Sequence, residues 1–470
     1  MPALLRCLLA ASFLVLSACD APPRFDHVEP GEATPGGQTS VSRFDRAAFS
    51  QPAANLSHAR RLDFAVGNSF FRSPWVIAPA TTTARDGLGP LFNTNACINC
   101  HIRDGRGHPA QTDARNAVSM LVRLSLPERF GTPDELAHHG VVAEPVYGTQ
   151  LQDMAIPGVT PEAKIRVRYT AKPVTLGDGS VVELRQPHLT ISDLGYGALH
   201  PDTLFSVRVA PPMIGLGLLE AIDEADILAN ADPEDADGDG IAGRPNWVWD
   251  RATQRPTLGR FGWKAGQPSL NQQNADAFAN DLGLTSSLIP QDNCTDAQQS
   301  CRQAPHGGEP EVSDHLLAAV SFYTRTLAVP QRRVVDRAEV LAGKQLFHEV
   351  GCARCHTPRF TTSPRAAEPE LAGQVIYPYS DLLLHDMGEA LADGRSEFAA
   401  SGRHWRTAPL WGLGLTEAVS GHTQLLHDGR ARNVLEAILW HGGEAQSARD
   451  RVIELTAPQR QALLAFLHSL

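Results

Sequence analysis

The amino-acid sequence predicts a mainly α-helical fold of two domains, with a β-containing insertion in the N-terminal half. Three observations support this prediction. A Cys-x-x-Cys-His motif occurs once in each half of the chain, at 97–101 and at 352–356. Apolar residues near the C-terminus recur at helical spacing. Residues from about 115 to 215, by contrast, contain stretches that alternate or are rich in β-branched side chains.

The two motifs indicate the chemistry. In such a motif the two thiols attach a haem covalently, and the histidine is the proximal ligand of the iron. A zinc site would need the four thiolates in one place, but the pairs lie far apart and each has its own histidine. We therefore expect two haem c groups, in cytochrome c-like domains over 46–335 and 336–470. The residues concerned are Cys97, Cys100 and His101 in the first motif and Cys352, Cys355 and His356 in the second.

Residues 1–18 resemble a bacterial lipoprotein signal peptide. The apolar stretch is too short to span a bilayer, and the four residues ending at Cys19 resemble the site at which such a cysteine becomes lipidated. Ordinary cleavage, with Cys19 incidental, is the alternative. We expect a periplasmic protein that is anchored by lipid to the inner membrane, because Asp20 resembles a retention signal. Residues 19–45 are rich in Pro, Gly, Thr and Ser, which favours a flexible linker.

The β-rich insert is predicted over about 115–215, beside the first motif. Within it, 118–124 and 164–169 have the composition or alternation of strands. Asp178-Gly179 is typical of the turn in a hairpin.

The loop over 232–246 resembles the start of a calcium site. Asp235, Asp237 and Asp239 take alternate positions before Gly240, as the first carboxylates of a calcium loop do. The twelfth position is Asn246 and not a bidentate glutamate, so we expect a structural Ca²⁺ site rather than a full EF-hand. A solvated acidic turn is the alternative.

The C-terminal domain is predicted to place one amphipathic helix before its motif and two helices near its end. The first of these two covers about 434–440, with Asn433 as its N-cap. The last begins with the capping-box pair Thr456 and Gln459 and carries one apolar stripe.

Two further cysteines, Cys294 and Cys301, form a close pair in a polar loop. In an oxidising compartment a structural disulfide is expected, and a redox-active dithiol is the alternative. The formal net charge of −11 and the lack of a basic cluster argue against nucleic acid as a partner.

The second axial position of each iron decides between electron transfer and catalysis. Two strong ligands give a relay, whereas a vacant position admits peroxide or another small ligand. For the second haem, Met387, His385 and His427 are the preferred candidates for this distal position. Three more histidines of that domain remain open, namely His404, His422 and His441. For the first haem the sequence ranks no distal group.

Several further motifs, taken together, carry a family resemblance, namely Gly87–Pro90, Asp104–Gly107, Asp381–Gly388, Trp405–Gly412, His427–Ala431 and His441–Ala445. With them the chain resembles the bacterial di-haem oxidoreductase family, which older labels call thiol oxidoreductases. The resemblance covers roughly residues 60–470 and extends to the di-haem cytochrome c peroxidases. It implies one haem that accepts electrons, another that reacts with peroxide, and a tryptophan between them, for which Trp405 and Trp411 are candidates.

These features predict a di-haem oxidoreductase with peroxidase-like chemistry at one haem. A small periplasmic protein would donate the electrons, and peroxide or another small substrate would accept them. Two alternatives remain open. One is a pure electron-transfer cytochrome, and the other is an accessory redox lipoprotein of a metal-uptake system.

Overall fold

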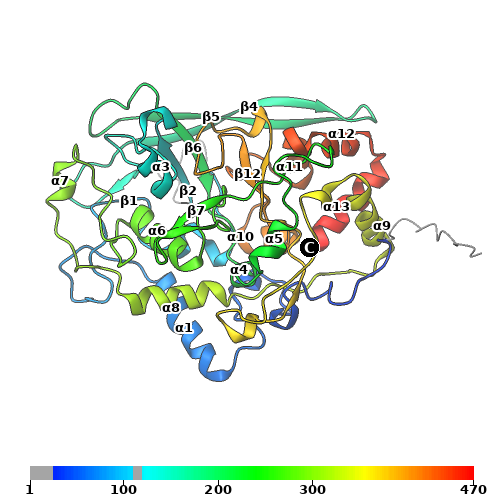
Figure 1. Ribbon diagram of the computed structural model, residues 1–470, viewed down its shortest axis with the longest axis horizontal. Coiled ribbons are helices and arrows are strands. Elements are labelled where there is room, and N and C mark those ends of the chain that lie inside the picture. The colour runs from blue at the N-terminus through cyan, green and yellow to red at the C-terminus, as the bar shows by residue number, and fades with distance from the viewer. Residues whose placement is uncertain (1–24, 110–118) are drawn as a thin grey trace, which may run out of the picture.

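The computed structural model describes residues 25–109 and 119–470, with helices and short strands distributed along the whole chain (Figure 1). The predicted signal peptide, Cys19 and the first part of the predicted linker lie outside the described residues. The helices are α1 His58–Arg72, α2 Cys97–Cys100, α3 Pro133–His139, α4 Leu216–Glu220, α5 Glu224–Leu228, α6 Leu270–Leu282, α7 Gln299–Arg302, α8 Asp314–Arg325, α9 Ala338–Glu349, α10 Thr416–Ser420, α11 Val434–Trp440, α12 Gln446–Glu454 and α13 Ala457–Ser469.

All strands in the described ranges pair antiparallel in two-stranded sheets. The pairs are β1–β3, β2–β6, β4–β5, β7–β8, β9–β10 and β11–β12. The strands are β1 Leu91–Phe92, β2 Met120–Ser125, β3 Met154–Ala155, β4 Lys164–Thr175, β5 Val181–Ser192, β6 Leu204–Val209, β7 Trp247–Asp250, β8 Arg255–Leu258, β9 Phe360–Thr361, β10 Val375–Ile376, β11 Leu384–Asp386 and β12 His404–Arg406.

The prediction of a mainly α fold is therefore wrong. The chain is 32% helical and 18% strand, with several small sheets. Five strands, β2 to β6, fall within 115–215, but six more lie beyond it, including two pairs in the C-terminal part. Those later strands have two to four residues each. Such short segments show too few alternations for a period of two to be recognised in the sequence.

Three helices build the core around the first motif. α1, α6 and α8 each begin after a serine, and the hydroxyl of that serine accepts a hydrogen bond from the third residue of the helix. α8 packs against both other helices. Between them, Phe71 lies 5.2 Å from Tyr323 and 6.1 Å from His101, measured between ring centroids. The first motif, on α2, therefore rests on aromatic side chains of α1 and α8.

The second motif follows α9, which crosses α13 at one end of the molecule (Figure 1). Gly343 allows this close crossing, because a Cβ there would lie 1.9 Å from the carbonyl oxygen of Ala462. The predicted helix over 434–440 is confirmed, and the side chain of Asn433 accepts from the amide of Glu436. The predicted capping box at the start of α13 is also confirmed.

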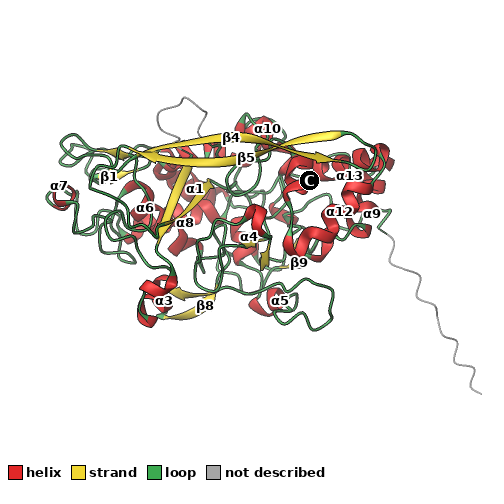
Figure 2. Ribbon diagram, turned by 90° about the horizontal axis from the view of Figure 1, so that it is seen from above, coloured by secondary structure: helices red, strands yellow, loops and turns green. Residues whose placement is uncertain are grey.

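A long hairpin from the N-terminal half packs against the C-terminal half. β4 and β5 form a ribbon with the predicted Asp178-Gly179 turn at its tip, and it crosses one face of the molecule in both views (Figures 1 and 2). Its tip reaches the C-terminal helices, where Asp178 pairs with Arg460 at 2.5 Å. Farther back, Arg185 donates to the carbonyls of Gly429 and Arg430. One hydrophobic cluster, from Met120 to Leu470, contains buried residues of both halves.

The N-terminal segment corrects the prediction of a flexible linker over 19–45. From Phe25 onward the chain is packed against the C-terminal half. Glu32 is 1% exposed and forms ion pairs with Arg332 and with Lys344 of α9. The composition of this segment favours a coil, but buried charge pairs with residues far along the chain determine its position.

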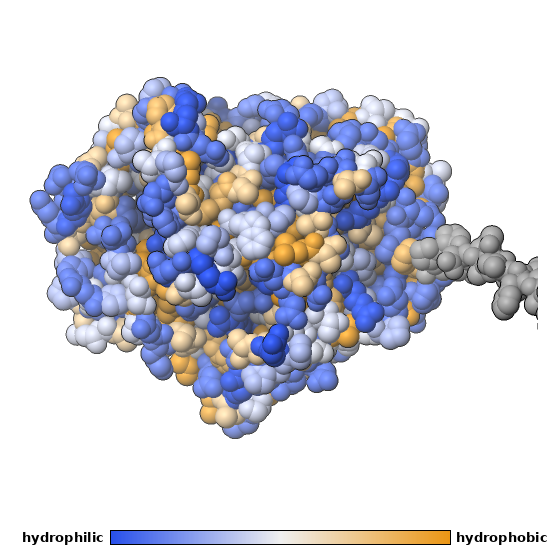
Figure 3. Space-filling model, viewed as in Figure 1, coloured by the Kyte–Doolittle hydropathy of each residue, from blue (hydrophilic) through white to orange (hydrophobic). Residues whose placement is uncertain are grey.

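Hydrophilic residues cover most of the face shown in Figure 3, and hydrophobic ones form small groups. No helix in the described part of the chain is long and apolar enough to cross a bilayer.

Candidate functional site

The first motif opens into a cavity of about 550 Å³. Cys97, Cys100 and His101 all line it. Nδ1 of His101 lies 2.8 Å from the carbonyl oxygen of Pro211. Nδ1 therefore carries the proton and donates this hydrogen bond, and Nε2 keeps a lone pair that can bind a metal. Burial lowers the pKa of His101 to about 4, which keeps the ring neutral and able to bind a metal.

Charged groups line another part of this cavity. Glu397 accepts from Arg395 at 2.8 Å and pairs with Arg208 at 2.9 Å. Burial alone would raise the pKa of Glu397, but these two guanidinium groups and that of Arg123 hold it well below its usual range. Asp281 differs, because burial raises its pKa to about 6 while Gln150 donates to it at 2.8 Å. Asp281 can therefore gain or lose a proton near neutral pH.

The second motif opens into a smaller cavity of about 240 Å³. Cys352, Cys355 and His356 line it. Nδ1 of His356 lies 2.9 Å from the carbonyl oxygen of Tyr379. Burial lowers the pKa of His356 to about 4, and a charge on the nearby His441 acts in the same direction. The two motifs thus present their histidines in the same way.

The three preferred distal candidates all line the second cavity, but their surroundings differ. Both ring nitrogens of His385 are taken, Nε2 by Asp381 at 2.8 Å and Nδ1 by Glu444 at 2.6 Å. These carboxylates raise the pKa of His385 well above its ordinary value, although burial opposes them, so the ring is charged. His427 is neutral and stacks on Trp405, with 3.7 Å between the ring centroids. Met387 is half-buried.

His441, which the sequence left among the open histidines, also lines this cavity. It follows α11 directly, and its Nδ1 lies 2.7 Å from the carbonyl oxygen of Ala437. The signal in the sequence was its position directly after the predicted helix. A histidine at the end of a helix can donate to one of the last carbonyl groups of that helix, as His441 does to Ala437.

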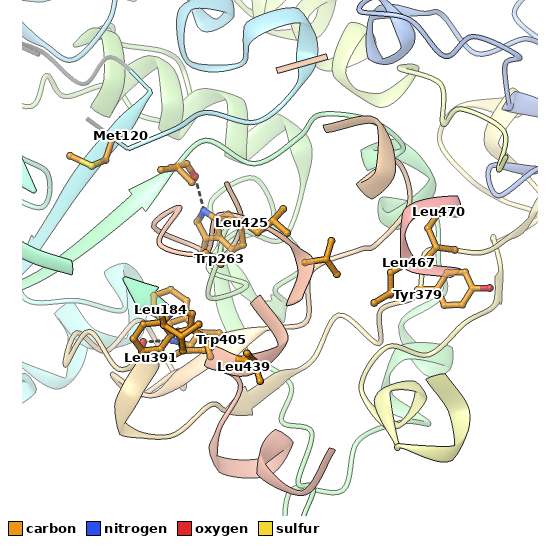
Figure 4. Close-up of a cluster of buried hydrophobic side chains, with 14 of the residues drawn as sticks. Met120, Leu184, Trp263, Tyr379, Leu391, Trp405, Leu425, Leu439, Leu467 and Leu470 are labelled. Carbon is orange, nitrogen blue, oxygen red and sulfur yellow. Dashed lines mark hydrogen bonds between the residues drawn. The ribbon is translucent and has the colours of Figure 1, made fainter. Parts of the chain in front are cut away.

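The two cavities share one wall. Trp263 lines both of them, and its indole N–H donates to the carbonyl of Val209 at 2.8 Å (Figure 4). Trp405 lines only the second cavity and Trp411 only the first. Sequence reasoning missed Trp263, which no motif marks. The other residues common to both cavities are Arg106, Arg406, Ala408, Pro409, Leu413 and Leu425.

Comparison with protein families identifies the family of this chain. The family described as "Di-haem oxidoreductase, putative peroxidase" matches residues 31–470, which is nearly the whole chain. The chain belongs to this di-haem oxidoreductase family. No curated protein matches it. The family supports haem as the cofactor and a redox function.

The residues of this di-haem oxidoreductase fit haem at both motifs. In each cavity two thiols and one tethered, neutral imidazole are brought together, which is the donor set that a haem iron and its vinyl groups require. Arg106 adds a positive charge to the shared wall. Its Nε is buried and has no hydrogen-bond partner among the described residues, so it suits an anionic group such as a haem propionate.

The acidic loop of the oxidoreductase is arranged differently from the prediction. Carboxylate oxygens of Asp232, Asp235 and Asp237 lie within 4.8 Å of one another, as ligands of one ion would. Asp239 points elsewhere and pairs with Arg354, inside the second motif, at 3.0 Å. Asp232 was missed because it stands before the alternating pattern.

Cys294 and Cys301 are joined by a disulfide. Cys294 lines the first cavity, and Cys301 is buried. Between them, Gln298 donates to the buried Glu162, which accepts from the backbone of Gln152 in the cavity wall. The disulfide therefore fixes a loop at the edge of the first cavity.

Proposed function

We propose that this oxidoreductase carries a haem c attached covalently at each motif and reduces peroxide, or another small substrate, at one of the two haems. Cys97 and Cys100 hold the first haem, and Cys352 and Cys355 the second. A small periplasmic protein donates the electrons. Each peroxide takes up two electrons and two protons and leaves as two molecules of water.

One observation carries this proposal, namely that two cavities with equivalent donor sets share a wall containing Trp263. Cofactors bound in the two cavities would lie on either side of this wall, where electrons could pass between them without a separate carrier. The aromatic ring of Trp263 supplies a polarisable path there. The family match to an oxidoreductase agrees with this arrangement.

The haems, when bound, supply one-electron redox chemistry and an iron on which peroxide can bind. The protein supplies the rest. His101 and His356 offer Nε2 to iron, and their Nδ1–H groups fix the direction of each ring. Arg106 neutralises negative charge between the cavities. Asp281 can take up and pass on a proton in the first cavity, since burial raises its pKa to about 6, close to neutral pH.

The proposed location is the periplasm, with a lipid anchor at Cys19 on the inner membrane. Support comes from the resemblance of residues 1–18 to a lipoprotein signal and from the disulfide, which forms in oxidising compartments. We also propose that Asp232, Asp235 and Asp237 bind a structural Ca²⁺. The adjacent Asp239–Arg354 pair connects that loop to the second motif.

The test is to express the full chain with the export and haem-attachment machinery of a bacterium and to count covalently held haem with the pyridine assay. Two equivalents are expected. A variant with Cys97→Ser and Cys100→Ser should retain one, whereas the matched variant with Cys294→Ser and Cys301→Ser should retain both. Fewer than two equivalents in the natural sequence would contradict the proposal.

Turnover is tested on the same protein with peroxide and a reduced small cytochrome or copper protein as donor. Peroxide-dependent oxidation of the donor is expected. Two haems that remain low-spin in every redox state, together with inertness to peroxide, would instead identify an electron-transfer cytochrome.

A further inference from the structure

We propose that His441 would bind, together with His356, the iron of a haem at the C-terminal motif, which would make this haem bis-histidine and low-spin. This inference rests on the proposed function, because it requires a haem at Cys352 and Cys355. It assigns the two haems different roles. The C-terminal haem relays electrons, and the substrate binds at the N-terminal one.

The first observation is a shared hydrogen-bond pattern. In His101, His356 and His441 the Nδ1 atom lies 2.7–2.9 Å from a backbone carbonyl oxygen. All three rings line a cavity, and in His356 and His441 the Nδ1 contact is the one ring hydrogen bond among the described residues, which leaves Nε2 without a partner. A histidine that binds a metal through Nε2 almost always donates its other N–H to a carbonyl or carboxylate. His441 thus has the surroundings of the two motif histidines without belonging to a motif.

The second observation is that His441 is held rigidly. It follows the last residue of α11, and its amide donates to Ile438, while its carbonyl accepts from Arg449 at 3.2 Å. The Nδ1–carbonyl bond to Ala437, four residues earlier, fixes the side chain against the helix. Because Nδ1 carries the proton donated to this carbonyl, the neutral ring has its lone pair on Nε2, where a metal can bind. A ligand fixed in this way loses little freedom when it binds a metal.

The other candidates in the cavity lack this combination. His385 has no free nitrogen, because Asp381 and Glu444 occupy both. His427 stacks flat on Trp405, and neither of its ring nitrogens is tethered to a carbonyl; its nearest charged partner, Asp428, is 3.8 Å away. Met387 carries a thioether, which would raise the reduction potential of the haem relative to histidine. Its flexible side chain has no hydrogen bond that could orient it.

The cavities themselves agree with this division of roles. The second cavity, of about 240 Å³, is lined mainly by apolar side chains and already contains His356 and His441. The first, of about 550 Å³, is larger and carries Asp281, Gln150 and the half-buried Glu397 with its arginines. The first cavity thus has room and polar side chains for a substrate, and among the described residues no second tethered histidine lines it.

The experiment uses the full holoprotein and begins with its haem count. Near-infrared magnetic circular dichroism and low-temperature EPR of the oxidised protein then report the axial ligands of each haem. We expect one haem with the charge-transfer band of two histidines. In His441→Met this band should disappear, a histidine–methionine band should replace it, and the midpoint potential of that haem should rise. In His441→Ala one equivalent of low-spin iron should be lost.

His427→Ala and Met387→Leu are the matched variants from the same cavity, and both should keep the bis-histidine band. Two covalent haems with no bis-histidine signal in the natural protein would overturn the inference without affecting the proposed function, and this measurement needs no variant. The inference would also be overturned if the bis-histidine band were lost in His427→Ala and kept in His441→Ala. A haem count below two would instead reject the proposed function.

Discussion

The buried charge cluster around Glu32 gives a sharp test of how the N-terminal segment is held. Glu32 accepts from Lys344 at 2.7 Å and from the hydroxyl of Tyr379 at 3.0 Å, and it pairs closely with Arg332. The charged side chains of Arg332 and Lys344 are each 2% exposed. In a Glu32→Gln variant, Lys344 keeps Glu29 at 2.9 Å, but Arg332 keeps only uncharged partners.

Removing one partner of a buried ion pair costs about 3–5 kcal/mol, because the remaining charge is left desolvated. The equilibrium constant for folding should therefore be lower in Glu32→Gln than in the natural protein by roughly a hundredfold or more. Glu29→Gln is the matched control. Its carboxylate binds the same lysine but is 32% exposed, so the expected loss is at most about 1 kcal/mol.

The effect should depend on pH. Burial alone would raise the pKa of Glu32, but Arg332 and Lys344 bring it below its ordinary value of 4.5. A carboxyl with a lowered folded-state pKa stabilises the protein above its unfolded pKa, and this contribution is lost as the pH falls through the folded value. The difference in the free energy of unfolding between the natural protein and Glu32→Gln should thus be largest at neutral pH and should decrease below pH 4.5.

Urea unfolding followed by tryptophan fluorescence measures these differences, and equal slopes with urea concentration would show that the same surface is exposed in each variant. The reasoning fails if Glu32→Gln is no less stable than Glu29→Gln at neutral pH, since Arg332 would then not depend on the buried carboxylate.

Three further predictions concern the helix crossing, the shared wall and the acidic loop. Gly343→Ala places a methyl group 1.9 Å from a carbonyl oxygen of α13 and should cost about 1–3 kcal/mol in urea unfolding, whereas the exposed Ala342→Ser should change it little. Trp263→Leu should slow electron transfer between the haems in flash photolysis while the haem count stays at two; an unchanged rate would remove this ring from the path. Asp237→Asn should weaken Ca²⁺ binding in titration calorimetry, and no heat in the natural protein would exclude the site.

Local features were predictable from the sequence. The cap at Asn433, the capping box at Thr456 and the turn at Asp178-Gly179 each depend on residues within one turn of chain, and all three occur in the structure. The motif cysteines and histidines could be named for the same reason, because their spacing alone determines which atoms lie together.

Features that depend on distant residues were not predictable. The packing of Glu32 depends on partners about three hundred positions away, so composition alone favoured a linker. Trp263 forms the shared wall only because both cavities meet there. The local pattern favoured His385 over His441. One ring nitrogen of His385, however, is bonded to Glu444, which lies after α11 and far from His385 in the sequence. Two-residue strands such as β9 and β10 exist only through their pairing.

The contact between Phe25 and α9 has a consequence for the orientation of the molecule relative to a membrane. The Phe25 ring stacks on His348, and its amide donates to Gln345. The interval from Cys19 to Phe25 is six residues, which even fully stretched spans only about 20 Å. With a lipid at Cys19, as proposed, the end of the molecule that carries α9 would face the membrane at close range. The opposite end would face outward, where a diffusing protein could approach it.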